Sequence, residues 1–276
     1  MTLSDLILHP TTRRNLQNYL RQPTHALLLT GEKGVGLGTI AKTLAREIAG
    51  ANLVIITPRL HDQQKTLSIN VDDIRDLRQL TRDRRSDPLC LVIDEAESMT
   101  TSAPEAFLKA LEEPTAQVFY ILTTHAPAKL PRTIRSRAQI IEILPPPAEA
   151  CEGLFDGFQN DKILKITFLA DRKPAEMMRL LTDEDHFRAA AAAVTAAKDF
   201  VQGSPATRLE IVAGTTTRQA AIDLTENIAK ILMMTAERAK TPNSTAENLH
   251  LVAATLDNLN QNGNLRAQLT NLALNL

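Results

Sequence analysis

Five short runs of apolar residues in the first half of the chain most constrain its fold. They lie at residues 26–30, 53–57, 89–94, 118–123 and 140–143. The runs hardly alternate between apolar and polar residues, so strands made from them are buried on both faces. Segments with the apolar spacing of helices separate the runs. Together these patterns predict an α/β fold, in which a parallel sheet carries helices on both faces.

Three consecutive prolines, Pro145 to Pro147, separate this half from the rest of the chain. A triple proline continues neither a strand nor a helix, so we expect a boundary there. Beyond it the apolar residues have helical spacing throughout. We expect short helices within 161–185, a helix over 187–201 and a long helix from about 206 to 240. Two leucine-striped helices then follow on either side of Asn262-Gly263.

Composition narrows the class of protein. The chain has 7 Phe, 2 Tyr and no Trp, which favours helix-rich packing over an aromatic-rich β-sandwich or barrel. A net charge of −1 excludes nucleic-acid binding through a strongly basic tail, although a local basic face stays possible. Cys90 and Cys151 are too few for a disulfide framework and lack metal-binding spacing, so we expect no metal site. Lacking a signal-peptide or membrane-helix pattern, the chain is expected to be soluble and cytoplasmic.

A glycine-rich loop, GEKGVGLGT at residues 31–39, follows the first apolar run and precedes a helical pattern. Such a loop cradles phosphates, because its backbone N–H groups can surround the oxyanions. In the pattern G-x-x-x-x-G-K-[ST], Leu37 stands in place of the lysine and Gly38 in place of the magnesium-binding hydroxyl. We therefore expect no hydrolysis; weak binding or a shifted register is the alternative. The candidate nucleotide contacts are Gly31, Gly34, Gly36 and Thr39.

Asp94 and Glu95 stand at the end of the third apolar run. At the carboxyl end of a parallel strand beside a phosphate loop, such an Asp can hold Mg²⁺ and such a Glu can polarise the attacking water. Taken alone, the pair also fits a strand end with solvated acids. With the loop it forms a degenerate, vestigial nucleotide site, and we expect neither ATP nor Mg²⁺ as a cofactor.

A row of arginines recurs at helical spacing: Arg75, Arg78, Arg82 and Arg85. The opposite face of the same helix would be apolar, with Ile74, Leu77 and Leu80. Arginines in a row can follow a nucleic-acid backbone, which makes Arg78, Arg82 and Arg85 candidate DNA contacts. The alternative is a solvated face balanced by the neighbouring acids Asp72, Asp73, Asp76 and Asp83.

Two further segments indicate a family. Residues 106–114, AFLKALEEP, resemble the A-L-L-K-x-L-E-E-P segment of bacterial clamp-loader subunits. Residues 121–125, ILTTH, and 130–137, LPRTIRSR, are similar to the sensor-1 strand and T-I-x-S-R-C signature of that family. The resemblance implies an AAA+ architecture: a RecA-like, P-loop NTPase-like domain at 1–145, a helical lid at 146–186 and an all-α collar bundle at 187–276.

Within this family the chain most resembles the delta prime type of subunit of DNA polymerase III. The gamma/tau ATPase subunits keep the loop Lys and Thr that are replaced here by Leu37 and Gly38. Near Ala175 the family places a nucleotide-sensing arginine, and the zinc-module cysteines of relatives are absent. His125 and Ala138 also depart from the residues usual there, Asn and Cys.

The chain keeps Ser136-Arg137 of the signature. The resemblance implies that Arg137, beside Ser136, is an arginine finger acting in trans on a neighbouring ATPase subunit, an effect worth about 10³–10⁵ in rate. It also implies a non-hydrolysing stator of the replicative clamp loader. The partners would be gamma/tau and delta subunits, the sliding clamp and, through the complex, primer-template DNA.

Three alternatives stay open at this point. Arg137 could pair structurally with an acid such as Glu142. The chain could be an active gamma/tau-like ATPase with a deviant loop. It could also be an AAA+-like adapter outside replication.

Overall fold

The computed structural model describes residues 1–276 apart from 62–65, 82–85, 156, 159 and 240–241. The chain forms two compact units, Met1–Met178 and Arg179–Leu276. The division into three domains at 145 and 186 stays a prediction. Among the described helices, none is long and apolar enough to cross a membrane.

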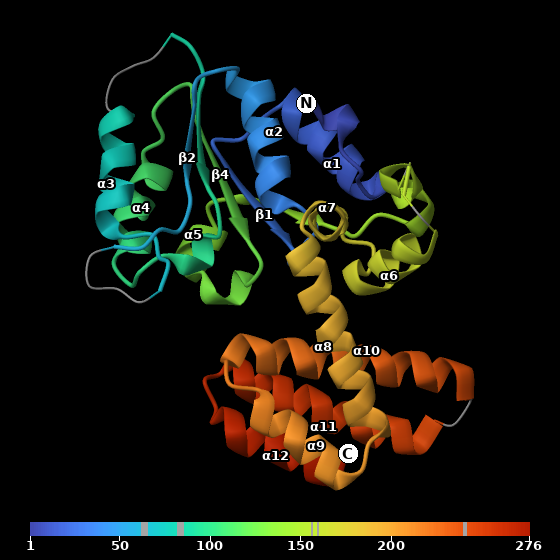
Figure 1. The fold of residues 1–276 in the computed structure, drawn as a ribbon. Helices are drawn as coiled ribbons and strands as arrows, with labels where there is room; N and C mark the ends of the chain where they lie inside the picture. Colours follow the sequence, from blue (N-terminus) through green and yellow to red (C-terminus); the bar gives the residue numbers. More distant parts are fainter. Residues whose placement is uncertain (62–65, 82–85, 156, 159, 240–241) are drawn as a thin grey trace. The chain divides into compact units, whose positions relative to one another are not determined.

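The first unit contains a five-stranded parallel sheet (Figure 1). Its strands are β1 (Ala26–Gly31), β2 (Leu53–Ile56), β3 (Leu89–Ile93), β4 (Val118–Thr124) and β5 (Gln139–Ile143). The spatial order is β2-β3-β4-β1-β5, so β1 pairs only with the two strands that come last in the chain. The five strands expected from the apolar runs are confirmed.

Helices cover both faces of this sheet. The helices α1 (Pro10–Arg21) and α2 (Leu37–Ala49) pack on one face, and α3 (Val71–Leu80) and α4 (Ala103–Glu112) on the other. Successive side chains of a strand enter different cores: Leu27 and Leu29 lie in the cluster under α1 and α2, and Leu28 in the other. The apolar runs are uninterrupted because both faces are buried.

Shorter helical segments complete the first unit. They are the 3₁₀ helices η1 (Leu3–Asp5), η2 (Ala96–Ser98), η3 (Pro127–Lys129) and η4 (Ala148–Phe155), and the α-helices α5 (Arg132–Arg135) and α6 (Asn160–Ala170). The helix α7 (Pro174–Thr182) begins in this unit. Of these segments, α5 and the first turn of α7 position residues of the candidate sites.

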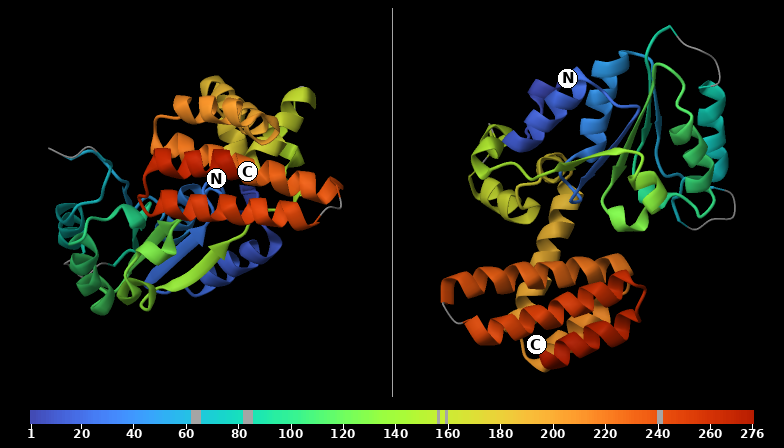
Figure 2. Two further views of the ribbon diagram at one scale, coloured as in Figure 1. Left: turned by 90° about the horizontal axis from the view of Figure 1, so that it is seen from below. Right: turned by 180° about the vertical axis from the view of Figure 1, so that it is seen from behind.

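The second unit is a bundle of α-helices (Figure 2). They are α8 (Glu184–Gln202), α9 (Pro205–Gly214), α10 (Arg218–Ala239), α11 (Pro242–Asn260) and α12 (Leu265–Asn275). Both expected leucine stripes enter one core, with Val252, Leu259, Leu269 and Leu272 fully buried. The expectation of an all-α bundle after the α/β part is confirmed.

The single helix expected from about 206 to 240 is wrong. The chain leaves the helix after Gly214 and resumes it at Arg218. The N–H of Thr215 donates to the carbonyls of the turn before it, and the hydroxyl of Thr217 accepts the N–H of Ala220 at 3.2 Å. Threonines compete with helical hydrogen bonds in this way, so one continuous pattern becomes two capped helices.

Candidate nucleotide loop and interface arginine

The glycine-rich loop joins β1 to α2, as predicted. Gly34 and Gly36 have φ angles of 93° and 95°, a conformation that favours glycine. The Gly34 carbonyl accepts the backbone N–H groups of Ala175 at 3.0 Å and Glu176 at 3.2 Å. The first turn of α7 therefore rests on the loop.

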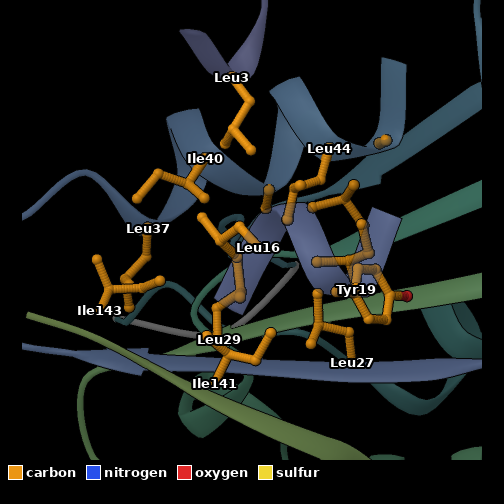
Figure 3. Close-up of a cluster of buried hydrophobic side chains, with 14 of the residues drawn as sticks. Leu3, Leu16, Tyr19, Leu27, Leu29, Leu37, Ile40, Leu44, Ile141 and Ile143 are labelled. Carbon is orange, nitrogen blue, oxygen red and sulfur yellow. The ribbon is translucent and has the colours of Figure 1, made fainter. Parts of the chain in front are cut away.

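Leu37 belongs to the apolar core (Figure 3). Its side chain is 2% exposed and lies beside Ile40 and Ile143. A P-loop lysine at this position would reach the β- and γ-phosphates, whereas the leucine carries no charge and faces the core. The loop therefore lacks a cation at the position that normally neutralises phosphate.

Asp94 occupies the space beside Gly38. A Cβ atom added to Gly38 would lie 2.6 Å from Asp94 Oδ2 and 3.1 Å from Oδ1. The Thr123 hydroxyl donates to Asp94 Oδ1 at 2.6 Å and so holds the carboxylate in place. A magnesium-binding Ser or Thr at position 38 would need the carboxylate to move. Thr39, the next hydroxyl along the chain, is exposed.

The carboxyl ends of β3 and β4 bring further polar groups to the loop, as expected for parallel strands. The N–H of Glu95 donates to Thr123 Oγ1 at 2.9 Å, and the Glu95 residue itself is exposed. His125 Nδ1 lies 2.9 Å from the Gly31 carbonyl oxygen, and the His125 N–H donates to Glu97 Oε1 at 3.0 Å. These polar groups therefore lie near the loop, and they bond to one another.

A cavity of about 310 Å³ adjoins the loop. Leu6 and Leu8 line it from the N-terminal segment, Val35 from the loop, and Ala175 from α7. The described residues that line it include no Lys or Arg. Asp5 also lines it, and the Thr2 N–H lowers the pKa of that carboxyl. The cavity is therefore apolar with an anion at its edge, and Ala175 stands beside the loop where the family places an arginine.

Ser136 and Arg137 directly follow α5. The Arg137 guanidinium donates from NH1 to the Thr133 carbonyl at 3.1 Å and from NH2 to Glu112 Oε1 at 2.8 Å. The Ser136 hydroxyl donates to the same Thr133 carbonyl at 3.2 Å. The side chain of Arg137 is 37% exposed and that of Glu112 is 51% exposed. Arg137 thus pairs with an acid of its own chain, as the structural alternative held, but that acid is Glu112, at the end of α4, and not Glu142.

The candidate DNA contacts lie almost wholly outside the described residues. Arg82 and Arg85 fall in the undescribed segment 82–85, and of Arg78 only the backbone, within α3, is described. Arg75, which begins the row, is exposed and donates to Asp72 Oδ1 at 3.0 Å. Contact of this face with DNA stays a prediction.

Two side chains of α3 differ from the expected solvated and apolar faces. Asp73 is buried and forms an ion pair with Arg59, and His61 Nε2 lies 3.3 Å from its Oδ2 atom. The N–H of Asn70 also donates to it at 2.8 Å. Leu80, on the expected apolar face, is 44% exposed, whereas Ile74 and Leu77 are buried.

Sequence reasoning missed the partners that hold these sites. Glu112 lies in the AFLKALEEP segment, but its separation of 25 positions from Arg137 in the sequence hides their contact. Lys173 Nζ, which pairs with Glu32 Oε2 at 2.7 Å, and Thr123 carry no sequence signal of their role.

In the described part of the chain, no group of three or more His, Cys, Asp or Glu residues could hold a metal ion. Cys90 and Cys151 are both buried. Burial raises the pKa of the Cys90 thiol to about 12 and also raises the pKa of Cys151. Neither thiol is therefore poised as a nucleophile.

Comparison with curated proteins supports the family resemblance. The family model described as DNA polymerase III, delta subunit, matches residues 49–147. The tau subunit of DNA polymerase III from Bacillus subtilis is 30% identical over 146 residues, which are 46% of this chain and 26% of that protein. The delta' subunit from Haemophilus influenzae is 26% identical over 144 residues, 45% of this chain and 44% of that protein. The matched part is thus less than half the length of either relative.

Two solved structures from Thermotoga maritima share the fold. A DNA polymerase III gamma subunit-related protein has a TM-score of 0.56 at 19% identity and covers 94% of this chain and 97% of its own. The RuvB Holliday junction branch migration motor has a TM-score of 0.52 at 18% identity and covers 77% and 83%. At such identities the likeness shows the fold alone. The matched part of the chain is thus similar to subunits of bacterial DNA polymerase III, and the fold is similar to that of a DNA polymerase III gamma subunit-related protein.

Proposed function

We propose that the chain is a delta prime-like stator subunit of a replicative clamp loader. In this function it does not hydrolyse ATP, and it supplies Arg137 in trans to a neighbouring ATPase subunit. The observation that carries the proposal is the state of the nucleotide loop, where Leu37 lies in the core and Asp94 lies against Gly38. Such a loop lacks the lysine and the magnesium-binding hydroxyl on which phosphoryl transfer depends.

The surroundings of Arg137 support action on another chain. Of the five N–H donors of a guanidinium, the contacts with Thr133 and Glu112 use two. The side chain is 37% exposed, which leaves part of it accessible to a partner. An arginine whose own subunit does not hydrolyse ATP can assist hydrolysis only at a neighbour's site.

The proposed partners follow from the family. They are gamma/tau and delta subunits, the sliding clamp and, through the assembled complex, primer-template DNA. The curated relatives named as tau and delta' subunits of DNA polymerase III support an assembly of this kind. The proposal includes no bound ATP or Mg²⁺ in the chain's own loop.

Single-turnover ATP hydrolysis by a reconstituted complex tests the proposal. We expect Arg137→Ala to slow hydrolysis at the adjacent site by about 10³-fold, the lower end for an arginine finger, without preventing assembly. Arg132→Ala is the matched control, because Arg132 is an exposed arginine of α5, the short helix that Arg137 follows. Unchanged hydrolysis by an assembled complex that carries Arg137→Ala would contradict the proposal.

A second candidate function is an active gamma/tau-like ATPase. It is favoured by the curated relatives at 30% identity, which are named tau or gamma/tau subunits. In that case Asp94 would hold Mg²⁺ and Glu95 would polarise the attacking water. ATP turnover by the purified chain that Glu95→Gln abolishes would select this function over the stator. We expect no such turnover.

A further inference from the structure

Glu112 places a negative charge directly against the guanidinium of Arg137. Glu112 Oε1 accepts NH2 at 2.8 Å, while the Thr133 carbonyl accepts NH1 at 3.1 Å. These two contacts give the planar guanidinium a defined orientation. Both charged side chains stay partly exposed, so an incoming anion can reach the arginine in this orientation.

The local sequence determines where Glu112 lies. It is the last residue of α4, and Pro114, two residues on, prevents the helix from continuing. The end of a helix carries partial negative charge, so an acid there destabilises the helix unless a cation lies close by. Glu113 adds a second acid at the same end. The stability of α4 alone would favour a neutral or basic residue at position 112.

The ion pair between Glu112 and Arg137 is weak enough to break when another anion binds the arginine. An exposed ion pair is weak, because water screens it and two side chains lose freedom in forming it. A terminal phosphate carries more charge than a carboxylate and can take two parallel N–H groups of an arginine. The phosphate can therefore displace Glu112, whereas a less highly charged anion competes poorly.

We propose that Glu112 is a positioning residue that restrains Arg137. It orients the guanidinium in the free subunit, and its charge opposes engagement of the neighbouring nucleotide until a phosphate displaces it. This inference rests on the proposed function of Arg137 at the subunit interface. Glu112 would thereby set the ATP concentration at which the neighbouring site becomes active.

Glu112→Gln separates orientation from charge, because the amide oxygen can still accept the NH2 group. In the reconstituted complex we expect this variant to lower the KM for ATP by about two- to fivefold, the range of an exposed ion pair, with kcat unchanged. Glu113→Gln is the matched control, since it removes the neighbouring exposed charge and should leave KM unchanged. The decrease in KM caused by Glu112→Gln should become smaller as the salt concentration rises, because salt screens an exposed ion pair.

A double variant tests whether the effect acts through Arg137. Adding Glu112→Gln to Arg137→Ala should change neither the KM nor the kcat for ATP beyond the effect of Arg137→Ala alone. The inference would be overturned if Glu112→Gln left the KM for ATP unchanged, or if it lowered the KM in the Arg137→Ala background as well. Either result would leave the stator proposal standing. If Arg137→Ala itself leaves hydrolysis unchanged in an assembled complex, both proposals fail together.

Discussion

Leu37 and Gly38 are neighbours in the loop, and each changes the site in a different way. Leu37 adds an apolar side chain to the core beside Ile143. Gly38 has no Cβ, and this lets the Asp94 carboxylate lie where a hydroxyl would otherwise stand. Placing Lys at position 37 and Ser or Thr at position 38, as in the phosphate-binding pattern, therefore does not by itself rebuild the site.

Leu37→Lys should destabilise the protein without creating an ATPase. The variant places an ammonium group among apolar side chains, and we expect the free energy of unfolding to fall by about 2–4 kcal/mol. Leu37→Met is the control, because it keeps apolar volume and should cost under about 1.5 kcal/mol. Chemical denaturation and an ATP turnover assay check both variants. Full stability together with turnover in Leu37→Lys would mean that the side chain turns towards the loop.

Gly38→Ala tests how firmly Asp94 is held. Gly38 lies in α2, where alanine normally gains about 1 kcal/mol over glycine. We expect Gly38→Ala to bring no such gain in the free energy of unfolding in the wild-type background, because the new methyl group would meet Asp94 Oδ2. In the Asp94→Ala background the variant should stabilise the protein. Equal effects of Gly38→Ala in both backgrounds, measured by denaturation, would show that the carboxylate moves aside freely.

The sequence could predict that positions 37 and 38 depart from the pattern, because counting along the chain is enough. It could not predict that Asp94 would fill the space at Gly38, since that depends on how β3 aligns with the start of α2. The contact of Arg137 with Glu112 was hidden for the same reason. Local spacing carries no information about the register of distant elements.

At the scale of elements, the glycine loop is supported by the first turn of α7. Two N–H groups of this turn bond to the Gly34 carbonyl, and Lys173 pairs with Glu32. A Cβ at Gly34 would lie 3.0 Å from the Glu176 Cβ, so the packing leaves no room for a side chain. The loop and α7 should therefore move as one piece.

Gly34→Ala should weaken this contact, and Gly50→Ala is its matched control. Both glycines have positive φ, but a Cβ at Gly50 would have no atom within 4 Å. Backbone strain is thus common to both variants, while overpacking is confined to Gly34. We expect Gly34→Ala to cost about 1–3 kcal/mol more than Gly50→Ala in unfolding free energy. Equal costs would argue against a tight contact between the loop and α7.

The strands were easier to predict than the helices of the second unit. A strand buried on both faces needs an uninterrupted apolar run, and few other elements produce that pattern. The break between α9 and α10 depends instead on the hydroxyl groups of Thr215 and Thr217, which bond to nearby backbone. Helical periodicity continues across such a break, so spacing alone does not reveal it.

At the scale of the whole molecule, the two units have separate cores and should open independently. Both thiols, Cys90 and Cys151, are buried in the first unit, so alkylation reports only on that unit. Arg218 belongs to the second unit, where it donates to the carbonyls of Leu259 at 2.6 Å and Gly263 at 2.9 Å. Each unit therefore offers its own site for a destabilising substitution.

Thiol labelling should distinguish the two units. We expect Gly34→Ala to speed labelling of the native protein about tenfold, because it raises the population of the opened first unit. Arg218→Met should leave the labelling rate unchanged while reducing amide protection in α10 and α11, where charged hydrogen bonds are lost. Faster labelling by Arg218→Met would mean that the two units unfold as one cooperative body.

The order of the strands also has a consequence for the newly synthesised chain. β1 occupies an inner position, and both of its neighbours, β4 and β5, come from much later in the chain. At the usual rate of translation, about 5–20 seconds therefore pass between the synthesis of β1 and that of β5, and β1 lacks its native strand partners for that time. The sheet closes only once residues near 143 have left the ribosome. During that interval the nascent chain exposes an apolar segment without its native partners, and we expect the first unit to be prone to aggregation until β4 and β5 are available.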